Sequence, residues 1–332
     1  MGAGMTSSRI SLDRIARAAR EIDPVFLRSP QFRAESLGAS LGADVVVKVE
    51  AVNPIRSFKG RGADFFVREL ADASRPLACA SAGNFGQGLA YAARRRAIAL
   101  DVFAAVKANP LKIERMRALG ARVHLAGHDF DAAKAAARDH AARHGARYVE
   151  DGREVAITEG AGTIGVELAT WPDPIDVLLV PLGNGALLGG VATWMRAHAP
   201  ATSIVGVCAE GAPSMALSWR ASKPVETESA NTIADGIAVR VPIPEAVADI
   251  QALVDDIVLV DDVATLGAMR RLFAHLGIVV EPAGAVGIGA MIADPRRWAG
   301  KRVATILCGG NLTLEQVGDY ALTGAGEEPG RR

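Results

Sequence analysis

The stretch IDVLLVPLGNGALLGG, residues 175–190, indicates the class of fold to which this chain belongs. A run of Val and Leu is followed by a glycine turn and then by residues suited to a helix. An apolar strand without alternating polar residues is typical of a parallel sheet that helices cover on both faces. The stretch therefore predicts a β-strand, a turn and an α-helix in sequence.

The same pattern recurs along the chain, which predicts an α/β fold with two open, twisted, mostly parallel sheets covered by helices. Further strands are predicted in the second half at 203–210, 256–260 and 302–310. In the first half, strands are predicted at 43–50, 76–81, 100–106, 121–126 and 147–151. Helices are predicted at 12–22, 63–72, 86–96, 110–120 and 130–145. The weakly periodic residues 216–237 predict a long loop, and the polar tail 323–332 predicts disorder.

Composition excludes several classes of protein. The formal net charge is zero and no run of like charges occurs, so nucleic acid is not an expected partner. The three cysteines, Cys79, Cys208 and Cys308, are far apart and odd in number, which argues against a disulfide framework or a zinc site. We found no apolar run long enough to span a bilayer and no signal peptide, so we expect a cytoplasmic protein without a membrane partner. The opening MGAGMT fits a myristoylation pattern, which we attribute to chance.

One lysine stands in an unusual setting. In NPIRSFKGRGA, residues 53–63, Lys59 lies between Phe58 and Gly60, where a strand has ended and a helix is expected to begin. A solvated surface lysine does not need such neighbours, whereas an amine nucleophile or general base does. Taken alone, a lysine is more often a surface charge. Its interpretation therefore depends on the loops that would surround it.

Three further loops rich in small residues follow predicted strands. They are SAGNFGQG at 81–88, PLGNGALLGG at 181–190 and CGGN at 308–311. In parallel α/β sheets, ligands bind beyond the carboxyl ends of the strands, where such loops collect. Small residues let backbone amides approach an anion at a helix N-terminus. Together with the lysine segment, these loops predict one ligand site.

A dinucleotide site is a competing interpretation of the 181–190 loop. Gly183 and Gly185 follow a strand and open a helix, as in a dinucleotide-binding loop. Glu210, at the end of the next predicted strand, is placed like the acid that binds a ribose hydroxyl in such sites. However, the dinucleotide-binding pattern Gly-x-Gly-x-x-Gly needs its third glycine three residues after the second, and here Gly189 comes four residues after Gly185. A Walker A loop is excluded because no lysine follows these glycines. A nicotinamide-dependent oxidoreductase thus stays as a weak alternative.

Together the loops resemble the fold-type II pyridoxal-phosphate enzymes, and specifically their serine/threonine dehydratase branch. The resemblance covers nearly the whole chain in order: SFKGRGA, SAGNFGQG, EGAGTIGVEL, PLGNGALLGG, ADGIAV, VEPAGA and CGGN. It implies the two-domain, tryptophan synthase β-like fold, with the site in the cleft between the domains. Residues 1–51 and 151–322 would form the large cofactor-binding domain, and residues 52–150 a small inserted domain.

The resemblance also implies a role for each loop. Lys59 would condense with the aldehyde of pyridoxal 5'-phosphate, and its freed amine would act as general base at the substrate α-carbon. Asn84 would bind the ring hydroxyl, Phe58 would pack behind the lysine, and Cys308 would face the pyridine nitrogen. The phosphate would lie on the amides of Gly183, Asn184, Gly185, Ala186 and Leu187. Substrate contacts would come from Ser81, Ala82, Gly83, Asn84 and Phe85. Site candidates of lower priority are Ser57, Gln87, Gly236 and Glu281.

Departures from the family pattern bear on the reaction. Ala82 stands where racemases of this fold tend to have a serine, so dehydration is expected rather than racemisation. Phe85 stands where many threonine dehydratases have a histidine, which could favour a larger or less polar substrate. The neutral thiol of Cys308 cannot keep a ring nitrogen protonated, which favours rapid loss of a β-leaving group. Because Ala216 replaces an expected acid six residues after Glu210, we do not expect a protein-ligated metal ion.

The function that follows from the resemblance is β-elimination from an L-β-hydroxy amino acid such as threonine or serine, giving a 2-oxo acid and ammonia. Alternatives are a threonine synthase-like or β-replacement enzyme, a dehydratase of an unusual hydroxy amino acid, and a catalytically silent binding protein. A homodimer or higher homo-oligomer is expected. Because the chain ends soon after CGGN, we do not expect an appended regulatory domain.

Overall fold

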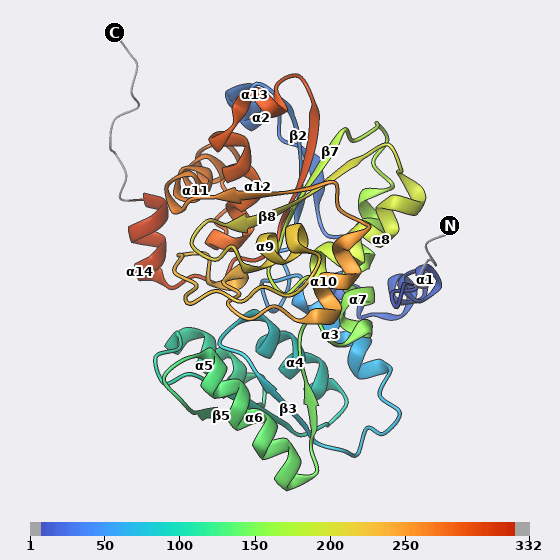
Figure 1. Ribbon diagram of the computed structural model, residues 1–332, viewed down its shortest axis with the longest axis vertical. Helices are drawn as coiled ribbons and strands as arrows, with labels where there is room; N and C mark the ends of the chain where they lie inside the picture. Colours follow the sequence, from blue (N-terminus) through green and yellow to red (C-terminus); the bar gives the residue numbers. More distant parts are fainter. Residues whose placement is uncertain (1–7, 323–332) are drawn as a thin grey trace.

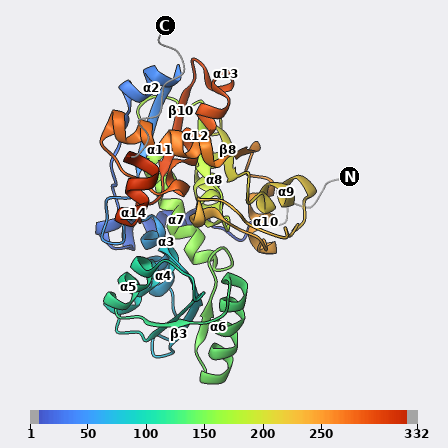
Figure 2. The same ribbon diagram turned by 90° about the vertical axis from the view of Figure 1, so that its left-hand side faces the viewer.

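The computed structural model describes residues 8–322, and in them the chain forms two sheets. The larger sheet has six strands in the order β1-β2-β10-β7-β8-β9, and the smaller has four in the order β5-β4-β3-β6. The smaller sheet and its helices lie below the larger sheet in Figure 1, and the same division is visible from the side in Figure 2. The tail at 323–332 and the opening MGAGMT, for which we made predictions, lie outside the described residues.

The larger sheet combines strands from both ends of the chain. Only the β1–β2 pair is antiparallel among its neighbouring strands, and the other pairs are parallel. Its strands are β1 (Gln31–Arg33), β2 (Asp44–Val49), β7 (Val177–Pro181), β8 (Ser203–Ala209), β9 (Asp256–Val260) and β10 (Arg302–Leu307). Strands β7 and β10 are almost wholly buried, as their continuous apolar runs predicted.

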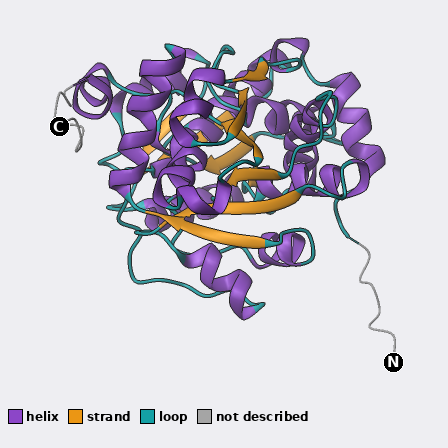
Figure 3. Ribbon diagram, turned by 90° about the horizontal axis from the view of Figure 1, so that it is seen from above, coloured by secondary structure: helices purple, strands orange, loops and turns teal. Residues whose placement is uncertain are grey.

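Helices lie on both sides of these strands, as the view from above shows (Figure 3). They are α1 (Leu12–Glu21), α2 (Glu35–Leu41), α7 (Val155–Leu168), α8 (Ala186–His198), α9 (Ser214–Ala221), α10 (Pro244–Gln251), α11 (Asp262–Leu276), α12 (Pro282–Ala293), α13 (Pro295–Trp298) and α14 (Leu314–Gln316). Two 3₁₀-helical turns, η1 (Pro24–Phe26) and η2 (Asp235–Ile237), and a π-helix, η3 (Val317–Leu322), complete the unit. No helix within residues 8–322 combines the length and the apolar character that a membrane crossing needs.

The smaller sheet is entirely parallel. Its strands are β3 (Leu77–Ala80), β4 (Leu100–Ala104), β5 (Arg122–Leu125) and β6 (Arg147–Val149). Its helices are α3 (Lys59–Arg68), α4 (Asn84–Arg95), α5 (Pro110–Ala118) and α6 (Phe130–His144). An apolar core that includes Leu77, Leu89 and Val102 is separate from the core around β7 and β10. The predicted α/β class with two mostly parallel sheets is confirmed.

The helix predicted at 63–72 begins four residues earlier, at Lys59. A β-carbon on Gly60 would lie 2.3 Å from the ring of Phe26, and one on Gly62 would lie 2.4 Å from the carbonyl oxygen of Ile157. These glycines lower helix propensity, which is why the pattern alone placed the start too late. They are needed because the first turn of α3 packs directly against other segments.

The prediction of a loop over 216–237 is wrong for its first residues, because α9 runs through Ala221. This helix has eight residues, and its buried side is made by Met215, Ala216 and two serines. The hydroxyl of Ser218 donates to the carbonyl of Ser214, one turn earlier, so a polar residue is satisfied on the buried face. A short helix with serines inside has little apolar periodicity to detect.

Candidate active site

A cavity of about 330 Å³ lies where the carboxyl ends of strands from the two sheets meet. The residues directly after β3, β6, β7 and β10 contribute to its wall, in agreement with the general rule for parallel sheets. Fifteen of the predicted site residues line it: Phe58, Lys59, Ser81, Ala82, Gly83, Asn84, Phe85, Gly183, Asn184, Gly185, Ala186, Leu187, Gly236, Glu281 and Cys308. Ser57 and Gln87 are buried but do not line the cavity.

Lys59 is the first residue of α3, and its side chain is 14% exposed. Its Nζ lies 2.5 Å from Oδ2 of Asp151 and 4.7 Å from the centroid of the Phe58 ring. The loop before it is fixed because the amide of Phe58 donates to the carbonyl of Cys308. Ser57 adds a second link, since its Oγ accepts from the amide of Lys59 and lies 3.4 Å from the same carbonyl. The amine is thus held on the cavity wall by an ion pair and a ring.

The loop at residues 183–187 leads from β7 into α8, and its backbone suits an anion. Gly185 has φ +91°, a left-handed conformation that glycine adopts without strain. A β-carbon on Gly183 would lie 3.1 Å from the carbonyl oxygen of Gly236, so the loop passes close to a second segment. The first amides of a helix have no partner within the helix and carry partial positive charge. This loop therefore offers a cradle for a phosphate group.

A buried polar network fixes Asn84. Its Nδ2 donates to Oε1 of Glu281 at 2.6 Å, and its Oδ1 accepts from Nδ2 of Asn311 at 2.8 Å. The second carboxylate oxygen of Glu281 accepts from the backbone amide of Asn311 at 3.2 Å. Burial raises the pKa of Glu281 to about 7, against the opposing effect of Lys112 and these hydrogen bonds. The orientation of the Asn84 amide is therefore set by partners on both of its ends.

Cys308 follows β10 and lines the cavity. Its Sγ donates to the carbonyl of Ala283 at 3.5 Å. Burial raises the pKa of this thiol, so the group is neutral at ordinary pH. The cavity wall has a neutral, weakly polar atom here rather than a carboxylate.

The loop after β3 begins α4. The Oγ of Ser81 accepts from the amides of Gly83 at 3.2 Å and Gly86 at 2.8 Å, so the serine hydroxyl stabilises its own loop. A β-carbon on Gly86 would lie 2.3 Å from the sulfur of Met116, which explains the need for glycine at this contact. The loop is held close to α5 as a result.

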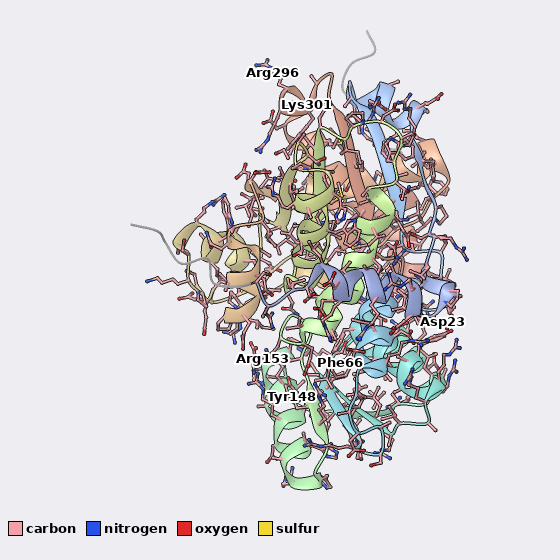
Figure 4. All side chains as sticks on the ribbon, turned by 90° about the vertical axis from the view of Figure 1, so that its right-hand side faces the viewer. Asp23, Phe66, Tyr148, Arg153, Arg296 and Lys301 are labelled. Carbon is pink, nitrogen blue, oxygen red and sulfur yellow. The ribbon has the colours of Figure 1, made fainter. Side chains whose placement is uncertain are left out.

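Several charged residues of the cavity were missed by the sequence analysis. They are Lys112, Asp131, Lys134, Glu150, Asp151, Asp235 and Arg240. Glu150 and Asp151 could have been found, because they follow β6 directly and so obey the same positional rule as the glycine loops. Figure 4 shows their neighbourhood, with Tyr148 in the smaller unit and Arg153 near its junction with the larger one. Asp235 lies in the ADGIAV motif, although no role was predicted for it, and the remaining residues come from helices and loops with no local signal.

Comparison with known proteins identifies the family of this chain and the cofactor that the family uses. Residues 22–309 match the family described as pyridoxal-phosphate dependent enzyme. The chain belongs to this family. The nicotinamide interpretation of the 181–190 loop is thereby set aside, and the cofactor of this pyridoxal-phosphate enzyme is the predicted one. The amine of Lys59, the amide cradle and the neutral thiol of Cys308 fit that cofactor.

Relatives of this pyridoxal-phosphate enzyme include the L-threonine ammonia-lyase of Thermotoga maritima, 33% identical over 310 residues that cover 93% of this chain and 77% of the relative. The catabolic L-threonine dehydratase of Staphylococcus aureus is 30% identical, with 94% of this chain and 92% of the relative covered. Threonine deaminase isoform 2 from Solanum lycopersicum superposes with a TM-score of 0.87 at 29% identity, covering 95% and 94% of the two chains. Maize serine racemase also gives a TM-score of 0.87, at 28% identity over 93% and 96%.

Proposed function

We propose that this protein is an ammonia-lyase that dehydrates and deaminates L-threonine or L-serine to the 2-oxo acid and ammonia. The observation that carries the proposal is the convergence of Lys59, the 183–187 cradle and the 81–85 loop on one cavity. Relatives named as threonine ammonia-lyase or dehydratase align with more than nine-tenths of the chain, which supports the same reaction class.

When bound, pyridoxal phosphate supplies an aldehyde that amines condense with and a conjugated ring that withdraws electrons from the substrate α-carbon. Residues 183–187 would hold the phosphate at the N-terminus of α8. Asn84 would direct a polar atom at the ring, because Glu281 and Asn311 fix its orientation. Cys308, being neutral, would leave the ring nitrogen without a strong proton donor.

The proton chemistry falls to Lys59. When its amine is not bonded to the cofactor, Nζ of Lys59 would accept the α-proton as general base. The ion pair with Asp151 keeps Nζ on the cavity wall. The electron pair of the Cα–H bond forms a Cα=Cβ double bond as the Cβ–O bond breaks, and the hydroxyl leaves as water with the proton that Lys59 accepted. A water molecule then hydrolyses the released enamine to the 2-oxo acid and ammonia. Ala82 has no side-chain proton donor for return of a proton to the opposite face of the α-carbon, which supports elimination over racemisation.

We also propose that the two sheets correspond to the expected domains, 1–51 with 151–322 and 52–150, because each sheet has its own apolar core. The protein would be a cytoplasmic homodimer or higher homo-oligomer. Its three free, buried cysteines suit a reducing compartment. Light scattering of the purified protein measures the assembly.

The test of function is turnover of purified holoenzyme with L-threonine and L-serine, measured as 2-oxobutanoate or pyruvate and ammonia. Lys59→Ala should abolish both the visible absorbance of lysine-bound cofactor and turnover. If the wild type shows that absorbance but releases 2-oxo acid only from O-substituted amino acids, the β-replacement alternative replaces the proposal. Full cofactor loading with no turnover of any amino acid would instead favour a binding protein.

A further inference from the structure

Lys112 is a cation on the cavity wall with no role in the proposed reaction so far. It belongs to α5, its side chain is 4% exposed, and it packs against the loop at 81–85. A β-carbon on Gly83 would lie 3.5 Å from its Cδ and 3.6 Å from its Nζ. The ammonium is therefore adjacent to the loop that is expected to bind the substrate carboxylate.

The partner of Lys112 comes from the unit of the larger sheet. Its Nζ lies 2.5 Å from Oδ2 of Asp235 in η2, and this pair bridges the two sides of the cavity. The two partners differ in environment, because the side chain of Asp235 is 56% exposed. Burial works against the charge of Lys112, but Asp235 and then Glu281 raise its pKa, so it stays an ammonium.

A buried cation needs an anionic partner, whereas an exposed carboxylate can leave for water at little cost. The ion pair is thus asymmetric: Lys112 must be neutralised by something, and Asp235 is the partner that can be replaced. An amino-acid substrate brings a carboxylate of the same charge and geometry into this cavity. The hydroxyl of Ser81 accepts two loop amides and can still donate its own O–H, but it brings no positive charge to that carboxylate, whereas Lys112 does.

We propose that Lys112 binds the α-carboxylate of the substrate, and that Asp235 occupies this cation in the free enzyme as an internal competitor. The inference rests on the proposed function in that the substrate is an amino acid. Gly83 leaves the approach to the ammonium free of a side chain. Binding of substrate would then release one link between the two sides of the cavity.

The two partners should have opposite effects on KM. In the full-length holoenzyme, Lys112→Gln should raise KM for L-threonine about tenfold to a hundredfold, with a smaller change in kcat, because a buried charge contact is lost. Asp235→Asn should lower KM, because the competitor is removed. Lys112→Arg, which keeps the charge, should lie between wild type and Lys112→Gln. Arg143→Gln, which breaks an exposed pair with Asp139 on α6, is the matched control and should change neither constant.

Binding measured without turnover separates this inference from the proposed function. L-alanine has the carboxylate but no leaving group, and L-alaninamide lacks the carboxylate charge. Calorimetry should show that Lys112→Gln weakens L-alanine binding and leaves L-alaninamide binding unchanged. The inference is overturned if both ligands weaken equally, if neither weakens, or if Asp235→Asn raises KM.

A wild type that turns over neither threonine nor serine would defeat the proposed function. The alanine comparison would still test Lys112 in that case, because it reads binding alone. Thermal unfolding of each variant, with Lys112→Arg as the charge-preserving reference, distinguishes a lost contact from a misfolded chain.

Discussion

The Nζ of Lys59 lies 2.5 Å from Oδ2 of Asp151, and the pair joins the first turn of α3 to the segment after β6. Asp151 is also buried, with its side chain 8% exposed. Its second oxygen, Oδ1, has no hydrogen-bond partner among residues 8–322. This carboxylate therefore pairs with the amine through one oxygen, while its other oxygen is buried without a hydrogen-bond partner among the described residues.

Asp151→Asn is expected to lower kcat for L-threonine about tenfold or more, with a smaller effect on KM. The neutral side chain of asparagine cannot form the ion pair that holds the amine of Lys59 in place. The kinetic constants and the cofactor content of the variant should be measured together. Asp139→Asn, on the exposed face of α6, is the control. Unchanged kcat in a fully loaded Asp151→Asn enzyme would show that the ion pair has no part in the reaction.

Gly185→Ala is expected to weaken cofactor binding. Gly185 has φ +91°, and an alanine there would meet strain of about 1–2 kcal/mol as well as a contact 3.0 Å from the β-carbon of Ala246. Titration of the apoprotein with pyridoxal phosphate measures the affinity. Gly277→Ala is a matched control, because Gly277 also has positive φ but a β-carbon there would meet no atom within 4 Å. Equal loss of affinity in both variants would refute the cradle.

The stability of the apoprotein should depend on Glu281. Burial raises its pKa to about 7 from the ordinary 4.5, so the folded chain holds the proton more tightly than the unfolded chain. The contribution is fully present below about pH 4.5 and is lost as pH rises through about 7, a change of about 3 kcal/mol. Urea unfolding between these pH values should show the decline, and Glu281→Gln should flatten it. A wild type and variant with parallel pH profiles would contradict this assignment.

Arg61 ties α3 to the larger sheet. It is fully buried, with Nη2 donating to Glu50 at 2.8 Å and Nη1 donating to Glu167 at 2.7 Å. Arg61→Ala should lower the free energy of unfolding by about 3–5 kcal/mol, because the buried carboxylate of Glu50 would lose its charged partner and Glu167 would keep only Lys48 as a charged partner. Urea unfolding followed by circular dichroism measures the loss. Arg143→Ala, at an exposed ion pair, should cause little change. A loss for Arg61→Ala no larger than for this control would be inconsistent with the network.

The local sequence determined the strands, the glycine loops after them and the placement of Lys59 beside those loops. These features are readable because each depends on neighbours in the chain: apolar runs make buried strands, and glycine is required where a turn or a close approach leaves no room for a side chain. The rule that ligands bind at the carboxyl ends of parallel strands places the segments that carry Lys59, Asn84, Gly185 and Cys308 at one site, and the family resemblance adds the expected role of each.

Only the tertiary structure decided the charge pairs of that site. Lys59 and Asp151 are 92 residues apart in the chain, and Lys112 and Asp235 are 123 apart. No periodicity or spacing connects such residues, because their contact depends on how α3 packs beside β6 in the first case and on how the two units pack against each other in the second. Burial also depends on the tertiary structure. The pKa of Glu281 is raised because the folded chain removes its carboxyl group from water, which its neighbours in sequence do not do.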